Sequence, residues 1–250
     1  MMKIIDCFPF FNELDLLEVR LNSLAPYVDE FVLSEMPVTH RGRRKPLFFE
    51  MNKERYKGFK ITHLIAPTID GSSWVLEHYQ REYLLNGIDH IAGPEDIILL
   101  SDLDEIPNLQ DWKQEEGVFR ELIYYYYFNV CGNRSWDTTV AFRRKNMRKT
   151  LQKVRNHKSL YPVLPYGGWQ FSTLGTPEEI VYKVESFAHV ELDKPEFKGE
   201  LGKRRENLLD PFVGGAPNWR QTPLKLTVEM PTGPKWLLEN KHRYPHLWLS

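Results

Sequence analysis

The chain has little cysteine, an almost balanced charge and no long apolar run. Its two cysteines, Cys7 and Cys131, are too few and too far apart in sequence to indicate a disulfide framework. A net charge of -1 gives no general attraction to nucleic acid or to anionic membranes. The first residues lack the apolar core of a signal peptide, and no apolar run approaches the length of a membrane span. We therefore expect a cytoplasmic globular protein with no transmembrane segment and no nucleic-acid partner.

The residues that are present favour an α/β domain. Hydrophobic residues make up 42% of the 250 residues, which is enough for the core of one domain. Short apolar runs that predict strands alternate with amphipathic stretches that predict helices. The strands are expected at 3–11, 29–35, 60–66 and 97–100, and the helices at 14–24 and 74–85. This alternation is typical of a mostly parallel sheet flanked by helices. Asn12 is the expected N-cap of the first helix, which should end near Pro26.

The pattern changes in the second half of the chain. Residues 121–129 and 138–142 are aromatic and β-branched, and they predict two antiparallel strands. The four tyrosines of the first strand are expected mainly in the core. Thr-Pro-Glu-Glu at 176–179 is a well-formed helix start, and 234–240 predict a short helix that docks on the domain.

Two carboxylates directly follow the most apolar strand. Residues 97–100 are Ile-Ile-Leu-Leu, and Asp102 and Asp104 come just after them, next to Glu105. Ligands of open α/β sheets bind beyond the carboxyl ends of such strands. Side chains two residues apart on an extended segment share a face. We therefore expect Asp102 and Asp104 to hold one divalent cation that bridges to phosphate oxygens. The alternative is a solvated acidic turn that caps a following helix.

Other stretches carry weaker signals. The paired glycines that end at Gly168 allow close backbone approach or positive φ, and Trp169 adds a flat apolar face, although an ordinary turn is the alternative. Glu185 and His189 are a potential base and a potential metal ligand, but a lone histidine is more often structural. Residues 143–158 contain eight lysines and arginines and no acid. A solvated basic face is the simpler interpretation, and a diphosphate could still use part of it.

Taken in order, these motifs resemble glycosyltransferase family 17. The resemblance covers most of the chain and rests on residues 11–21, Thr39, His40, Gly42, Pro46, Leu47, 79–81, 101–107, Gly168, Trp169, 185–189 and 234–240. It implies a GT-A-type nucleotide-sugar-binding fold, with a mostly parallel central sheet flanked by helices and a smaller antiparallel part. It also implies an inverting transfer from a UDP-activated, N-acetylglucosamine-like donor to a glycan acceptor. The cofactor that it implies is a divalent cation, usually manganese.

The resemblance also assigns roles to single residues. Asp102 and Asp104 match the Asp-x-Asp metal motif, and His189 matches a place where a further metal ligand is often found. The donor-side residues that it implies are Phe11, Asn12, Glu13, Glu35, Arg81, Ser101, Asp102, Gly168 and Trp169. Family members often carry an acid and a histidine where this chain has Gly167 and Gln170, which leaves the choice of acceptor open. The lack of a membrane anchor favours a microbial or viral enzyme.

The same family plan divides the chain and its chemistry. We expect one domain made of a nucleotide-binding half (1–110), an acceptor and catalytic half (111–197) and a C-terminal docking segment (198–250). An inverting transfer needs a carboxylate that deprotonates the acceptor hydroxyl. Glu178 and Glu185 are the candidates, and Glu178 is preferred because a helix N-terminus would keep it ionised. A first-turn acid without catalytic role is the alternative for Glu178.

Two other functional classes are compatible with parts of the sequence. A haloacid-dehalogenase-like phosphatase also uses Asp-x-Asp after an apolar strand, with the first aspartate, here Asp102, as nucleophile. That motif normally opens the chain, whereas here it lies near residue 100. A non-catalytic carbohydrate-binding protein would explain seven tryptophans and twelve tyrosines, but it would not need the acid cluster.

Overall fold

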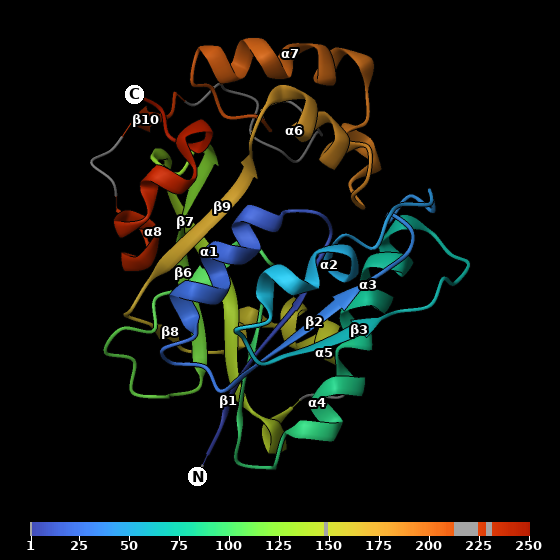
Figure 1. Ribbon diagram of the computed structural model, residues 1–250, viewed down its shortest axis with the longest axis vertical. Helices are drawn as coiled ribbons and strands as arrows, with labels where there is room; N and C mark the ends of the chain where they lie inside the picture. Colours follow the sequence, from blue (N-terminus) through green and yellow to red (C-terminus); the bar gives the residue numbers. More distant parts are fainter. Residues whose placement is uncertain (1, 148–149, 213–224, 229–231) are drawn as a thin grey trace.

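The computed structural model describes residues 2–147, 150–212, 225–228 and 232–250. The strands are β1 (Ile4–Pro9), β2 (Glu30–Glu35), β3 (Ile61–Ile65), β4 (Ile97–Leu100), β5 (Glu105–Pro107), β6 (Gly117–Tyr126), β7 (Val130–Arg143), β8 (Val163–Leu164), β9 (Gly168–Leu174) and β10 (Thr227–Val228). The α-helices are α1 (Leu14–Leu24), α2 (Phe48–Asn52), α3 (Ser73–Tyr83), α4 (Leu85–Ile91), α5 (Leu151–Asn156), α6 (Pro177–Val184), α7 (Pro195–Glu206) and α8 (Lys235–Glu239). Figure 1 shows the helices packed around one sheet, with α6 and α7 together at one end.

One continuous sheet runs through the molecule in the order β3-β2-β1-β4-β7-β6-β9-β5. Its first four strands are parallel, as the alternating sequence pattern predicted. Apolar residues of α1, such as Leu17 and Leu21, cover one face of these strands. Ile88 of α4 and Leu151 of α5 cover the other face. The strands are buried on both sides, and this is why their sequences are nearly continuous apolar runs.

The second half of the sheet contains the predicted antiparallel part. β7 pairs antiparallel with β4 on one side and with β6 on the other. Tyr124, Tyr125 and Tyr126 of β6 are buried, so the prediction that the tyrosine run belongs to the core is confirmed. β9 then runs parallel to β6 and antiparallel to β5. The sheet is therefore mixed, and both predicted parts belong to it.

Several boundaries differ from the sequence expectation. The prediction that Asn12 caps α1 is wrong, because the N-cap is Glu13 and it makes no side-chain cap hydrogen bond. Glu13 instead turns its carboxylate back to accept from the backbone N–H of Asn12, at 3.1 Å. The helix expected at 74–85 ends at Tyr83, and α4 begins at Leu85. The stretch around Gly168 and Trp169 is the start of β9 and not an ordinary turn.

The two helix starts read from the second half are confirmed. Thr176 caps α6 with a capping box, in which its side chain accepts from the N–H of Glu179 and the Glu179 side chain returns to the N–H of Thr176. The docking helix is α8, whose Leu237 lies in the same core cluster as the apolar face of α1. Within the described ranges, each helix is too short or too polar to cross a membrane.

A buried ion pair joins α1 to the central strands. The guanidinium of Arg20 contacts the Asp6 carboxylate of β1 through Nη2 at 2.6 Å and Nε at 2.8 Å, and both side chains are fully buried. Nη2 also donates to Ser101 Oγ at 2.6 Å. Nη1 donates to the backbone carbonyls of Asp102, Leu103 and Glu105. One arginine therefore holds the turn that follows β4.

We expect Arg20→Met to destabilise the protein by about 3–5 kcal/mol, because it leaves the Asp6 charge buried without a partner. Arg20→Lys should recover only part of this loss, since an ammonium cannot satisfy acceptors arranged around a planar fork. Urea denaturation measures both. The matched control is Lys53→Met, which removes an exposed pair with Glu50 and should change the stability much less than Arg20→Met does. Similar losses for Arg20→Met and Lys53→Met would contradict the structural role of Arg20.

Candidate functional site

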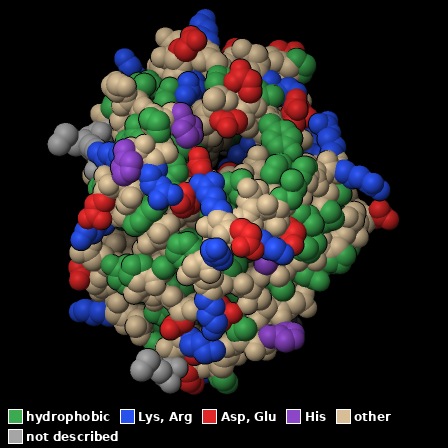
Figure 2. Space-filling view, viewed as in Figure 1, with side chains coloured by type: hydrophobic (Ala, Val, Ile, Leu, Met, Phe, Trp, Pro, Cys, Tyr) green, Lys and Arg blue, Asp and Glu red, His purple; other side chains and the backbone are tan. Residues whose placement is uncertain are grey.

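A cavity of about 640 Å³ opens beyond the carboxyl ends of β1, β2 and β4. It is lined by the loops that follow β1 and β2, by α3, by the turn after β4, by strands β6, β7 and β9, and by the segment from α6 to His189. Figure 2 shows this face of the molecule hollowed near its centre, with acidic and basic side chains together around the opening. Both halves of the sheet therefore contribute to one site.

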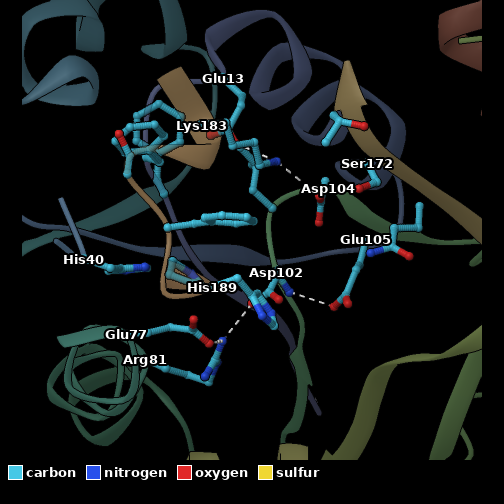
Figure 3. Close-up of a pocket in the computed structure, with 18 of the residues that line it drawn as sticks. Glu13, His40, Glu77, Arg81, Asp102, Asp104, Glu105, Ser172, Lys183 and His189 are labelled. Carbon is cyan, nitrogen blue, oxygen red and sulfur yellow. Dashed lines mark hydrogen bonds and ion pairs between the residues drawn. The ribbon is translucent and has the colours of Figure 1, made fainter. Parts of the chain in front are cut away.

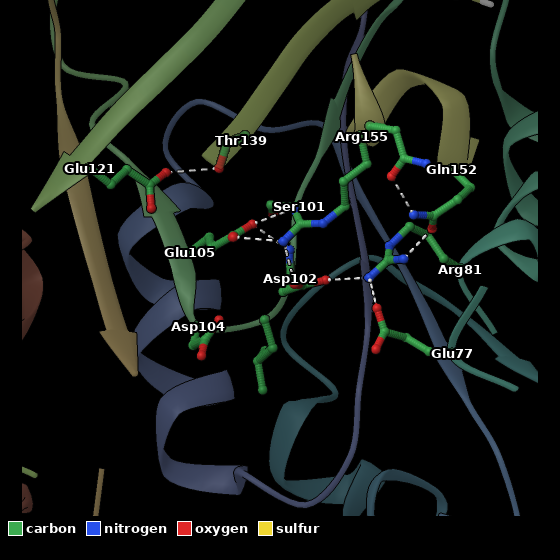
Figure 4. Close-up of polar contacts among 12 residues, drawn as sticks. Glu77, Arg81, Ser101, Asp102, Asp104, Glu105, Glu121, Thr139, Gln152 and Arg155 are labelled. Carbon is green, nitrogen blue, oxygen red and sulfur yellow. Dashed lines mark hydrogen bonds and ion pairs between the residues drawn. The ribbon is translucent and has the colours of Figure 1, made fainter. Parts of the chain in front are cut away.

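The acidic segment after β4 is a turn, so the prediction of an extended segment with both carboxylates on one face is wrong. The N–H of Glu105 donates to the carbonyl of Asp102 at 3.1 Å, and the Glu105 side chain accepts from the N–H of Asp102 at 2.8 Å. Arg20 donates hydrogen bonds to three backbone carbonyls of the same segment. This turn sends the carboxylate of Asp102 to Arg81 and Arg155 (Figure 4) and the carboxylate of Asp104 to Lys183.

Asp102 lies between two arginines. Its Oδ1 accepts from Arg81 Nη2 at 3.1 Å, and its Oδ2 accepts from Arg155 Nη2. Arg155 also grips the buried Glu105 carboxylate with two contacts of 2.8 Å. Burial opposes the ionisation of Asp102, but the charges of Arg155 and Arg81 outweigh it and hold the pKa of Asp102 well below its usual value. Asp102 is therefore a fixed anion with both oxygens engaged.

Asp104 has the opposite environment. Its Oδ2 lies 3.4 Å from Lys183 Nζ, and Lys183 also contacts Glu13 Oε1 at 3.2 Å (Figure 3). Burial raises the pKa of Asp104 to about 6, because the attraction of Lys183 is opposed by the neighbouring charges of Glu105, Asp102 and Glu13. Asp104 shares Lys183 with Glu13, so this position would gain from a further cation.

The predicted metal ligands share the cavity but do not form a closed site. Among the residues that the structure describes, no group of three or more His, Cys, Asp or Glu side chains is placed to hold a metal ion. Hard divalent cations often bind through one or two carboxylates, with phosphate oxygens and water completing the shell. Asp104 fits that requirement. Asp102 would first have to exchange an arginine, and the metal role of the pair stays a prediction.

His189 lies at the rim of the cavity, after α6. Its Nδ1 contacts Glu191 Oε1 at 2.7 Å, and its ring meets the edge of Trp74 with centroids 4.7 Å apart. A histidine that is oriented through one nitrogen can present the other to a ligand. The structure brings His189 to the same cavity as Asp102 and Asp104, and its role as a metal ligand stays a prediction.

The donor-side residues implied by the family plan separate into two groups. Phe11, Glu13 and Arg81 line the cavity, and the Phe11 ring stacks on Tyr182 of α6 at 5.4 Å. Asn12 does not line it.

Glu35 and Ser101 support the site from behind. Glu35 is fully buried and receives Lys45 Nζ at 3.4 Å and the N–H of Phe49 at 3.1 Å. The hydroxyl of Ser101 accepts from Arg20. Neither residue lines the cavity.

Gly168 and Trp169 are placed by packing and not by the cavity. A Cβ atom on Gly168 would lie 2.7 Å from Glu121 Cγ and 2.7 Å from the carbonyl oxygen of Ile106. The close backbone approach expected of these glycines is therefore confirmed. Trp169 packs against the main core cluster. Both residues belong to β9, which carries Gln170 and Ser172 of the cavity wall.

The two candidate bases flank α6 outside the cavity lining. Glu178 is exposed in the first turn of α6. Glu185 is its C-cap residue and contacts Lys198 Nζ of α7 at 2.5 Å. Lys183 of the same helix does enter the cavity. The choice of base between Glu178 and Glu185 therefore stays a prediction.

Sequence reasoning missed three residues of the site. The sequence assigns no role to Lys183, because a cation that faces a predicted acid pair leaves no signal there. Arg155 belongs to the basic stretch at 143–158, which was noted as a possible diphosphate contact. His40 donates from Nε2 to Gln80 Oε1 at 2.8 Å, and burial lowers the pKa of His40, which favours the neutral ring. His40 stands in the resemblance pattern, but without an assigned role.

Comparisons with known proteins agree with the earlier resemblance. A sequence model of glycosyltransferase family 17 matches residues 1–205. The beta-1,4-mannosyl-glycoprotein 4-beta-N-acetylglucosaminyltransferases of Homo sapiens and Rattus norvegicus are each 26% identical to this chain over 98% of its length. Those alignments cover 55% and 54% of the relatives, so the chain spans about half of their length. Among solved structures, S. aureus TarS 1-349 has 16% identity and a TM-score of 0.38, over 82% of this chain and 71% of that one.

We expect the stability of Asp104→Asn relative to the wild type to increase as the pH rises from 4 to 7 in EDTA. The unfolded chain ionises this carboxyl near pH 3.8, whereas the folded protein resists ionisation up to about pH 6. The wild type therefore loses stability over this range, on the order of 2 to 3 kcal/mol, and the variant does not. Urea denaturation at several pH values tests this, with the exposed Asp70→Asn as control. A stability difference that stays constant with pH would contradict the buried environment of Asp104.

Proposed function

The chain belongs to glycosyltransferase family 17, and from this premise we propose that it transfers a sugar from a UDP-sugar donor to a glycan acceptor with inversion of configuration. One observation carries the proposal. A single cavity contains Asp102 and Asp104 of the predicted Asp-x-Asp motif together with the cations Arg81, Arg155 and Lys183. This combination suits a donor that leaves as a diphosphate. The arrangement that we propose is GT-A-type, with the donor on the side of β1, β2 and α3.

The nucleotide would lie against the loop after β1. Phe11 offers an aromatic face there, and His40 and Gln80 add polar groups from the neighbouring loop and from α3. Gln80 is itself fixed, because its Nε2 donates to the carbonyls of Phe10 at 3.0 Å and Ser34 at 2.8 Å. A rigid polar group of this kind can orient a base or a ribose without a loss of side-chain entropy on binding.

The diphosphate would lie above the turn after β4. Its developing charge in the transition state needs cations that are already oriented. Lys183 is held on one side by Asp104 and Glu13, and their charges outweigh burial and raise its pKa, so it stays cationic. A divalent cation, which we propose to be manganese, would be held by Asp104 and would supply further charge neutralisation of the leaving diphosphate. The arginines that grip Asp102 keep that side of the turn rigid.

The transferred sugar that we propose is N-acetylglucosamine. Support comes from the names of the two relatives, which describe N-acetylglucosaminyltransferases that act on a mannosyl-glycoprotein. The phosphatase alternative loses its main requirement, because both oxygens of Asp102 are engaged by arginines and neither is free to attack phosphorus. A purely carbohydrate-binding protein would not require the cationic and acidic groups that meet in this cavity.

A direct test is the stabilisation of the protein by UDP. If Asp104 and a metal bind the diphosphate, UDP should raise the melting temperature clearly more in manganese than in EDTA. Asp104→Asn should remove most of this difference, and the exposed Asp70→Asn should not. Hydrolysis of UDP-N-acetylglucosamine, measured beside hydrolysis of p-nitrophenyl phosphate, separates transferase chemistry from phosphatase chemistry. Equal UDP shifts in manganese and EDTA would refute the metal, and no UDP shift in either buffer would refute the nucleotide-sugar site.

The base is tested separately, with Glu178 and Glu185 as the proposed candidates. Removing the true base should lower the transfer rate by 100-fold or more while UDP affinity stays near that of the wild type. The variants are Glu178→Gln and Glu185→Gln, and Glu196→Gln on the exposed side of α7 is the control. Because Glu185 also pairs with Lys198, the melting temperature of the Glu185→Gln variant must be measured in parallel. Near-normal transfer by both variants would exclude both residues as the base.

A further inference from the structure

Strand β9 sends two consecutive polar side chains into the cavity. Ser172 and Thr173 both line it, together with Gln170. In a regular strand, neighbours point to opposite faces. The pairing with β6 passes from Tyr125↔Ser172 directly to Tyr126↔Leu174, so Thr173 is an extra residue in β9. Such a bulge re-aims a side chain, and here it adds Thr173 to the row formed by Gln170 and Ser172.

The bulge holds an unfavourable backbone conformation. Thr173 has φ 51°, and Tyr126 opposite the bulge has φ 63°. This left-handed region is rare for a β-branched residue, because its side chain crowds the backbone there. Strain of this kind persists only where the surrounding structure imposes it, and it is concentrated at ligand sites. The direction of the Thr173 side chain is thus imposed by the fold.

Two oxygens of this row are buried without a partner. Gln170 is 8% exposed and Thr173 is 2% exposed. In the described part of the chain, Gln170 Oε1 and Thr173 Oγ1 have no hydrogen-bond partner. A buried polar atom that makes no hydrogen bond is costly and rare in native proteins. A hydroxyl that enters the cavity would relieve this cost after a small rotation of either side chain.

The row begins beside the acidic turn and continues away from the donor side. Gln170 pairs with Glu105, and the N–H of Phe171 donates to the carbonyl of Asp104 at 2.8 Å. Ser172 points into the same space as Asp104 (Figure 3). From there the cavity wall extends across β6 to β7, where Trp136 is 55% exposed. The proposed nucleotide contacts lie on the opposite wall, in the loop after β1 and on α3.

We propose that Gln170, Ser172 and Thr173 bind the hydroxyl groups of the acceptor's terminal pyranose, and that Trp136 contacts its apolar face. The inference rests on the proposed function, because only a transferase needs a second sugar beside the acidic turn. A neutral row suits alcohols, which donate and accept hydrogen bonds without carrying charge. An aromatic ring suits the C–H face of a pyranose.

The test uses methyl pyranosides of mannose, glucose, galactose and N-acetylglucosamine as acceptor probes. Saturation-transfer NMR gives their dissociation constants with and without UDP. Gln170→Met and Thr173→Val remove the polar atoms while nearly preserving shape, and each should weaken the best pyranoside about 3- to 10-fold. Thr173→Ser should restore most of the affinity. The UDP-induced melting shift should be unchanged in all three variants.

The matched control is Gln110→Met, an exposed residue outside the cavity, which should bind the pyranosides like the wild type. Two results would overturn the inference while leaving the proposed function intact. In the first, the wild type binds UDP, but it binds no pyranoside or the variants bind the pyranosides as tightly as it does. The other is weaker binding of UDP-N-acetylglucosamine but not of UDP, which would assign the row to the donor sugar. A loss of UDP binding in the wild type refutes the proposed function instead.

Discussion

The pairing of Arg20 with Asp6 sets the geometry on which the site depends. A guanidinium taken fully out of water must be compensated through all its nitrogens, and here β1 supplies a carboxylate while the turn after β4 supplies three carbonyls and a hydroxyl. The arginine comes from α1, so helix, strand and turn are fixed to one another by one side chain. The turn after β4 then determines the directions of the Asp102 and Asp104 side chains.

The fixed turn gives two neighbouring carboxylates different chemistry. Asp102 meets Arg81 and Arg155, and these charges outweigh the cost of burial. Asp104 meets one lysine and several acids, and there burial prevails. The first is locked as an anion with engaged oxygens, while the second remains responsive to an added positive charge. Two roles thus arise from one short motif because its surroundings differ, and not because its residues do.

Much of the fold could be predicted from the sequence, because hydrophobic periodicity and the residues that start or end helices and strands are local signals. The apolar runs of β1, β2 and β4, the capping residues of α6 and the aromatic strands β6 and β7 were each visible in their own segments. The turn after β4 was not, because its shape is imposed by Arg20, which lies about 80 residues earlier in the chain. The positions of Lys183 and Arg155 in the site could not be predicted for the same reason. Their positions depend on how distant elements pack, and so does the bulge at Thr173, which is visible only in the register of β9 against β6.

The continuity of the sheet has a mechanical consequence. Because β4 and β7 are directly hydrogen-bonded, the strands that carry the acidic turn and the strands that carry the opposite wall cannot swing apart as separate bodies without breaking a central ladder. The distance between the acidic turn and the polar residues of β9 is therefore fixed by strand register. Helix α6 lies outside this ladder. Its Lys183 lines the cavity, and its Tyr182 ring stacks on Phe11 of the loop after β1, so side-chain contacts and not strand pairing hold this part of the cavity wall.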